Sequence, residues 1–227
     1  MPSTDNHPPY VEKLITDVAQ VSQQTLQGVS TAQDLAELCE GVFGFAQDML
    51  QAVITQEPPP QPIDCSAGCW YCCTSESVMA LPIEVLAVAN TLQNQPLPDA
   101  LTETFDRHAP GTYVDLRQEG RICPLLQDQA CSVYNVRPSP CRGFNAYDHN
   151  TCKAKKVDGQ DAKIIGYAHQ RLVYQAAMTG LALGCERFGA ECDLIDLPSA
   201  LLVAHDDLEG CTERWLKGKT VFTSPTS

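Results

Sequence analysis

Four cysteines fall within nine consecutive residues of this chain, in the stretch CSAGCWYCC at residues 65–73. Four more follow about fifty residues further on, within residues 123–152. The eight thiols are Cys65, Cys69, Cys72, Cys73, Cys123, Cys131, Cys141 and Cys152. Such spacing restricts the fold strongly, because clustered thiols are usually held together by disulfides or by a shared metal ion.

Disulfides are not the expected explanation. The N-terminal stretch MPSTDNHPPY has neither the basic region nor the apolar region of a secretory signal. The sequence also lacks a run of about 18 apolar residues that could span a membrane. We therefore expect a cytoplasmic protein that binds no membrane, in a compartment where disulfides are rare.

A metal centre accounts for the cysteine spacing directly. In a C-x2-C motif, two thiolates on one turn reach the same ion and another segment supplies the remaining ligands. Thiolates favour zinc, copper(I) or iron–sulfur centres over harder cations. Cys72 and Cys73 would point in different directions on an extended backbone, so they would serve two metals, or one would be a bridging, outer or buried thiol. Two four-coordinate centres and one cluster with spare thiols both remain compatible with eight thiols.

Other interpretations of the cysteines compete with a metal centre. Free thiols pack like small apolar groups, and we expect this for the cysteines outside the two groups, which are Cys39, Cys185, Cys192 and Cys211. The CWYC stretch at residues 69–72 resembles a redox dithiol, but no βαβ pattern surrounds it. Conventional zinc-finger histidine spacing is missing, and His149, the one histidine near the cysteines, is expected to be solvated.

The charge distribution indicates which partners to expect. The net charge of −13 argues against binding to nucleic acid or to an anionic membrane. Residues 121–171 are the exception, with eight basic and four acidic side chains. Within them, Arg137 and Arg142 flank Cys141 and could donate hydrogen bonds to metal-bound sulfur atoms. The competing expectation is that both arginines are solvated or paired with acidic helices.

The N-terminal part of the chain has helical periodicity. The apolar spacing predicts one helix over about residues 10–27 and a second that begins with a Ser30–Gln33 capping box. The apolar face expected on the second helix is Leu35, Leu38, Val42, Phe45, Met49 and Val53. We expect these helices to form an antiparallel hairpin over residues 1–57, which packs on the metal domain or contacts a protein partner. A proline-rich linker follows at residues 58–64.

Residues 65–227 are expected to form a second domain, which contains the cysteines and several helices. The helices are predicted over about residues 82–93, 98–108 and 160–187 and from Pro198 onward, the third with a face of Ile165, Ala168, Leu172, Ala176, Thr179 and Leu183. Residues 120–152 are expected to be irregular, with short β-segments near CPLL and CSVY. The predicted fold is therefore mostly α, a helical protein with a loop-rich, cysteine-cluster metal-binding insert.

The order of the cysteine motifs resembles that of a known family. After CSAGCWYCC come CPLL at 123–126, CSVY at 131–134, RPSPCR at 137–142 and finally Cys152. This order is similar to that of the YkgJ-like family of zinc- or iron-chelating proteins, which is named for a CxxCxxCC signature. The opening C-x3-C is one residue longer than the signature implies.

The resemblance implies metal binding, with zinc and an iron–sulfur centre as the two candidate cofactors. We expect the eight clustered cysteines to be the ligands and the reaction, if there is one, to be unassigned. Flagellin lysine methylases carry a similar signature, so the alternative is an iron–sulfur-dependent enzyme with redox or protein-modifying activity. Metal storage or trafficking is a third hypothesis. The spacing of Cys65, Cys69 and Cys72 also matches radical-SAM enzymes, but the αβ repeat of their barrel is missing. P-loop, dinucleotide-binding and HExxH motifs are missing too.

Overall fold

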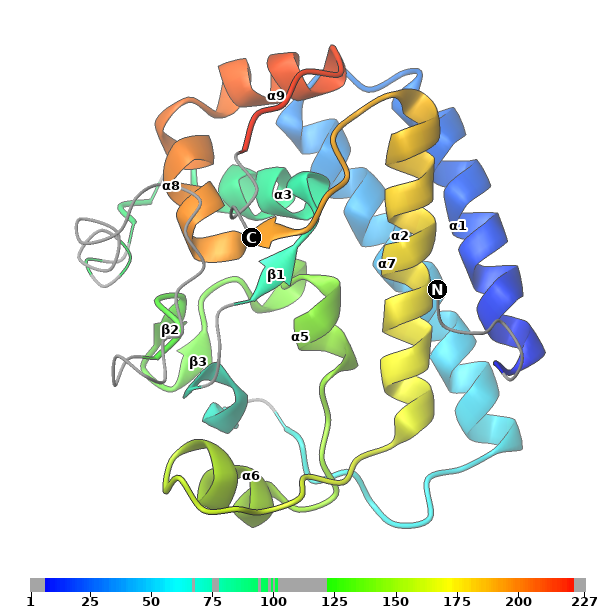
Figure 1. Cartoon of the computed structure of the whole chain (residues 1–227), viewed down its shortest axis with the longest axis vertical. Coiled ribbons are helices and arrows are strands. Elements are labelled where there is room, and N and C mark those ends of the chain that lie inside the picture. The colour runs from blue at the N-terminus through cyan, green and yellow to red at the C-terminus, as the bar shows by residue number, and fades with distance from the viewer. Residues whose placement is uncertain are drawn as a thin grey trace.

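The computed structural model describes residues 7–66, 68–74, 78–93, 95–97, 99, 101 and 122–222, and these are mostly helical, as predicted (Figure 1). The helices are α1 (Pro9–Leu26), α2 (Ala32–Gln56), α3 (Pro82–Leu92), α5 (Ser139–Gly143), α6 (His149–Lys156), α7 (Ala168–Phe188), α8 (Leu197–Asp206) and α9 (Leu208–Leu216). Strand β1 (Met79–Ala80) pairs with β4 (Ile195–Asp196), and β2 (Leu126–Gln127) pairs with β3 (Ala130–Cys131). Both pairs are antiparallel, and each strand has two residues. Among the described residues, none of the helices is both long enough and apolar enough to cross a membrane.

Helix α1 confirms the first predicted helix, and its main packing partner is α7, far away in sequence (Figure 1). The two helices approach closely because α7 presents glycines to α1. A Cβ atom on Gly180 would lie 2.7 Å from the carbonyl oxygen of Ile15, and one on Gly184 would lie 2.6 Å from Cβ of Ser22. Contacts between α1 and α2 are fewer, which the hairpin expectation did not foresee. The division of the chain at residues 57 and 64 stays a prediction.

Helix α2 begins with a capping box one residue later than predicted. The Thr31 hydroxyl accepts a hydrogen bond from the Asp34 amide at 3.1 Å, and the Asp34 carboxylate accepts one from the Thr31 amide at 2.9 Å. The Ser30–Gln33 assignment was therefore wrong. The predicted apolar face was also wrong at one position, since Phe45 is exposed and Phe43 is buried in its place.

Helix α3 lies at the centre of the hydrophobic core. It begins at Pro82, as predicted, because proline suits a first helical turn where its missing amide costs nothing. Its side chains are buried on every side, which is typical of a helix enclosed by other elements rather than lying on the surface. The helix predicted over residues 98–108 falls almost entirely outside the described residues, whereas the predicted C-terminal helical region is confirmed by α8 and α9.

Helix α7 begins at Ala168 rather than near residue 160. The Asn145 side chain accepts a hydrogen bond from the Tyr167 amide at 2.6 Å and donates one to the Tyr167 carbonyl at 3.1 Å. The Tyr147 amide also donates to the Ile165 carbonyl at 3.0 Å. These bonds hold the preceding segment in an extended form, and Ile165 is 59% exposed rather than part of a buried face.

The cysteine-bearing segment at residues 122–156 is short of regular structure, as predicted. Strands β2 and β3 pair where short β-segments were expected, and Asp128 and Gln129 join them with positive φ angles of 47° and 64°. Two positive φ angles in succession are typical of a tight hairpin turn. The short helices α5 and α6 were not predicted; α6 is capped by the Asp148 side chain, which accepts a hydrogen bond from the Asn150 amide at 2.9 Å.

Candidate metal centre

The structure brings the two cysteine groups together around one cavity of about 450 Å³. A hydrogen bond of 2.6 Å from the Cys123 amide to the Cys73 carbonyl joins the two segments directly. Six thiols line the cavity: Cys69, Cys72, Cys73, Cys123, Cys131 and Cys141. Residues fifty or more positions apart in the sequence therefore supply sulfur atoms to one cavity.

Cys72 and Cys73 lie on a 3-10 turn at Tyr71–Thr74 rather than on an extended backbone. Their side chains were expected to diverge only on an extended backbone, so that expectation does not apply. The two thiols instead hydrogen-bond to each other. That hydrogen bond, reinforced by the charges of Arg137 and Lys156, lowers the pKa of Cys72 to about 7. The same bond and burial raise the pKa of Cys73. Cys72 is therefore the cavity thiol most easily deprotonated.

Three further cavity thiols, Cys123, Cys131 and Cys141, have raised pKa values and resist ionisation. Burial is the first cause that raises the pKa of Cys123, to about 11, and the neighbouring Cys131 and Cys72 thiols contribute to this rise. Burial is also the first cause of the raised pKa of Cys141, followed by Cys123, Cys72 and Cys131. Negative charge on one sulfur thus opposes negative charge on the next. A bound cation would remove this repulsion, and its binding would release protons.

Cys65 and Cys152 are the two clustered cysteines that do not line the cavity. The Cys65 sulfur accepts a hydrogen bond from the Ala146 amide at 3.2 Å. Cys152 lies on α6 and is buried. Burial is the first cause that raises the pKa of Cys152, to about 11, followed by Cys65, Cys69 and Cys72 in that order. These two thiols therefore lie on the α6 side of the cluster, near Cys69 and Cys72.

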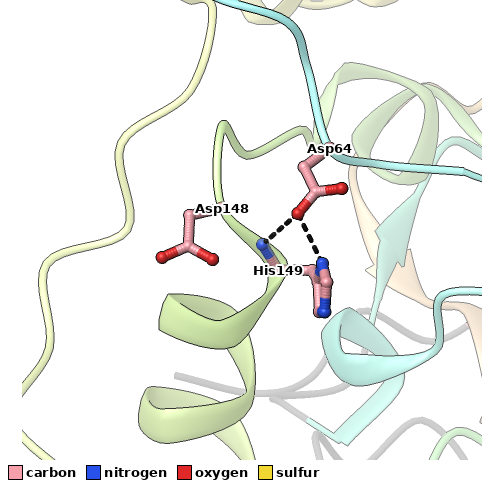
Figure 2. A group of neighbouring side chains, drawn as sticks. All are labelled: Asp64, Asp148 and His149. Atoms are coloured by element: carbon pink, nitrogen blue, oxygen red, sulfur yellow. Dashed lines mark hydrogen bonds and ion pairs between the residues drawn. The ribbon is translucent and has the colours of Figure 1, made fainter.

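Asp64, Asp148 and His149 form a separate group beside the cysteines (Figure 2). The ligand atoms of these three side chains all lie within 4.8 Å of one another. Among the residues that the structure describes, this is the group of metal-binding side chains that meets this distance criterion. Asp64 accepts hydrogen bonds from the His149 ring and from the His149 amide, and Asp148 caps α6. His149 also stacks on Tyr71, with 6.2 Å between ring centroids. The expectation of a solvated histidine missed these contacts, although Asp64 adjoins Cys65 and His149 precedes Cys152 by one helical turn.

The two arginines predicted to face the thiols lie in different surroundings. Arg137 lines the cavity, and its charge helps to lower the pKa of Cys72 and opposes the rise in the pKa of Cys131 and Cys141. Its guanidinium carbon lies 4.1 Å from the centroid of the Tyr134 ring, and its buried Nε has no hydrogen-bond partner among the described residues. An orphaned donor beside thiols is what a cavity built for negatively charged sulfur would contain.

Arg142 does not line the cavity. Its Nε donates to the Arg137 carbonyl at 2.8 Å, and its guanidinium also donates to the Asn135 carbonyl. The guanidinium carbon lies 4.2 Å from the centroid of the Phe43 ring on α2. Burial is the first cause of its lowered pKa. Arg142 thus joins the cysteine loop to the helices.

A cavity surrounded by soft sulfur donors defines a metal-chelating class of domain, since thiolates suit zinc and iron rather than magnesium or calcium. Residues 64–163 match the family model CxxCxxCC, described as a "putative zinc- or iron-chelating domain". The match covers less than half of the chain, and it confirms the resemblance in the cysteine motifs. No curated protein and no solved structure matches the chain.

Proposed function

We propose that the chain binds zinc or an iron–sulfur centre through Cys65, Cys69, Cys72, Cys73, Cys123, Cys131, Cys141 and Cys152. The observation that carries this proposal is the cavity at which two cysteine groups from separate segments converge. Three further features support it: the soft character of the donors, the mutual repulsion of the thiolates, and the orphaned Nε of Arg137.

The size of the cavity bears on what it could hold. Its volume of about 450 Å³ far exceeds the roughly 30 Å³ that one water molecule occupies in the liquid. A centre of several metal ions would fit, and so would one ion with an additional ligand. A bound metal would supply charge neutralisation to the thiolates, and it would tie residues 65–73 and 122–156 to the helical core.

An iron–sulfur-dependent enzyme is the second candidate function, and the cavity wall favours it. Apolar side chains of Leu125, Leu194 and Leu197 line the same cavity as the thiols. A purely structural metal site is closed by its protein ligands, whereas a catalytic site keeps space for another molecule. The apolar wall therefore supports access by a small substrate beside the metal.

We also place the protein in the cytoplasm. All twelve cysteines are free thiols, including the hydrogen-bonded Cys72 and Cys73. Thiolate ligands of a metal must be in the reduced form, which suits a reducing compartment.

Anaerobic purification followed by elemental analysis and absorption spectroscopy tests the metal proposal. We expect wild-type protein to contain zinc or iron, with broad visible absorption if the centre is iron–sulfur. Cys141→Ser and Cys131→Ser should each lose most of the metal. Cys192→Ser is the matched control, because Cys192 is also partly buried but lies outside the cavity.

Circular dichroism of each variant separates loss of metal from loss of fold. Full metal content in both cavity variants would reject the ligand assignment. Wild-type protein that holds neither zinc nor iron, even after reconstitution with zinc or with iron and sulfide, would reject metal binding altogether.

A further inference from the structure

A groove of about 870 Å³ runs between α1 and α2, and it belongs to neither the cysteine cavity nor the family domain. Val18, Leu38 and Val42 on its walls are buried. Val21 of α1 and Phe45 of α2 also line it, and they are 53% and 40% exposed. Two large apolar side chains thus face one open channel.

The groove exists because α1 is drawn toward α7. Gly180 and Gly184 allow α7 to contact the α1 backbone closely, whereas contacts between α1 and α2 are fewer. The short connection between Leu26 and Ala32 keeps α1 and α2 neighbours at one end. The apolar side chains that α1 and α2 direct toward each other therefore stay partly uncovered.

Gly41 lies on the groove, in the interior of α2. Glycine is unfavourable inside a helix, so a helical glycine usually has a packing reason. A Cβ atom at Gly41 would meet nothing within 4 Å, in contrast to one at Gly180. Packing within the chain does not require glycine at this position, and the missing side chain leaves the groove open to close approach of another molecule.

The charged residues that line the groove are all acidic. Asp17, Asp34 and Glu37 line it, and none of the described lining residues is a lysine, arginine or histidine. Asp17 forms an ion pair with Lys13 at 2.6 Å, and Asp34 is engaged in the capping box. Glu37 accepts a 2.9 Å hydrogen bond from the neutral side-chain amide of Gln33, which leaves its charge unbalanced. Residues 1–60 as a whole carry eight acidic side chains and one basic side chain.

We propose that this groove is the docking site for a basic amphipathic helix of a partner protein. The apolar face of that helix would cover Val21 and Phe45 and lie against Gly41, and its basic residues would face the acidic rim. Helices commonly bind proteins in this way, with an apolar face laid into a groove. A second copy of this chain fits less well, because two acidic surfaces would meet and each chain has a net charge of −13.

The test uses a fluorescein-labelled peptide of leucine and lysine, about eighteen residues long so that it can form an amphipathic helix. A scrambled peptide of the same composition lacks the apolar face but keeps the charge. Fluorescence anisotropy measures the affinity of both peptides for the full chain. We expect the amphipathic peptide to bind about tenfold more tightly than the scrambled one.

Gly41→Leu and Gly44→Leu form a matched pair of variants. Both glycines are exposed on α2 and have free space at Cβ, but Gly44 does not line the groove. Gly41→Leu should fill the groove and weaken binding of the amphipathic peptide about tenfold, while Gly44→Leu leaves it unchanged. Metal content measured on the same samples should be unaffected by either change, so this result is independent of the metal proposal.

Equal affinities for the two peptides, or equal behaviour of the two variants, would overturn the proposal. Sedimentation analysis of the chain alone tests the other possible occupant of the groove, which is a second copy of this chain. A dimer that Gly41→Leu dissociates would mean that a second copy occupies the groove, and the basic-helix proposal would then be wrong.

Discussion

The buried carboxylate of Glu84 accepts two hydrogen bonds from Ser139, one from its amide and one from its hydroxyl, each 2.7 Å long. A third, of 3.0 Å, comes from the Leu81 amide. Glu84 lies in the first turn of α3, and Ser139 begins α5, the helix that carries Cys141. One buried charge therefore fixes the position of a cavity thiol relative to the core.

We expect Glu84→Gln to lower the free energy of unfolding by about 1–3 kcal/mol, because an amide cannot accept all three hydrogen bonds and leaves a buried donor unpaired. Urea denaturation of the metal-free protein measures this change. Thr91→Ala, on the same helix but at an exposed position, serves as a control, and we expect a smaller effect. A Glu84→Gln variant as stable as the wild type would contradict the assigned role.

The same carboxylate should make stability depend on pH. Burial, the largest cause, raises the pKa of Glu84 above its ordinary value of 4.5 and outweighs its hydrogen bonds, which lower it. A raised folded-state pKa gives a contribution that is complete below the unfolded pKa and is lost as pH rises through the folded pKa. Relative to Glu84→Gln, the wild type should therefore lose stability as pH increases upward from about 4.5. Denaturation curves of both proteins at several pH values measure this. If the stability advantage of the wild type over Glu84→Gln grew with pH, the prediction would be rejected.

Gly180→Ala should destabilise the packing of α1 on α7 by about 1–3 kcal/mol, because the added methyl group would overlap the backbone of α1. Gly44→Ala is the matched control, since a Cβ atom there meets nothing within 4 Å. Removing that helical glycine should stabilise the protein by about 0.5–1 kcal/mol. Thermal denaturation should shift the two variants in opposite directions; the same direction for both would contradict the packing described here.

Arg137→Ala and Arg142→Ala should affect different properties. Loss of Arg137 removes the charge and the orphaned donor beside the thiols, so metal affinity should fall about 10- to 100-fold. Loss of Arg142 removes its hydrogen bonds to carbonyls, so the metal-free protein should lose about 1–3 kcal/mol of stability. Chelator competition and urea denaturation measure the two effects, and a reversed pattern would mean that the arginine roles are exchanged.

Cys72 should be the most reactive thiol of the reduced, metal-free protein at neutral pH. Its alkylation rate with iodoacetamide should follow a titration with a midpoint near its pKa of about 7, because the thiolate is the nucleophile. Cys73→Ala removes the hydrogen bond that is the largest cause of this low pKa, and the rate at pH 7 should fall about tenfold. Peptide mass spectrometry identifies the labelled thiol; faster labelling of Cys131 or Cys65 would refute the prediction.

The helices whose signals are local could be predicted from the sequence. Val11, Leu14 and Val18 follow the helical period and are buried in α1, and Pro82 begins α3 where proline is favoured. The start of α7 could not be predicted, because bonds from Asn145, more than twenty residues away, hold the backbone at Tyr167. Likewise, the choice of Phe43 over Phe45 for burial depends on which side of α2 meets other elements.

Convergence of the cysteine groups could be predicted because clustered thiols need a common partner. Their arrangement around the cavity could not, since it depends on the 3-10 turn at Cys72 and Cys73 and on the docking of α6. The different surroundings of Arg137 and Arg142 depend on contacts with Tyr134 and Phe43, which sequence spacing does not encode.

The pairing of α1 with α7 bears on how the chain is made. Helix α1 ends at Leu26 and its main partner is complete only at Phe188. At about 5–20 residues per second, the apolar stripe of α1 would wait on the order of ten to thirty seconds for its partner to leave the ribosome. During this interval the nascent chain exposes an apolar, aggregation-prone surface on α1. Its yield in cells should therefore depend on chaperones that bind the first helix.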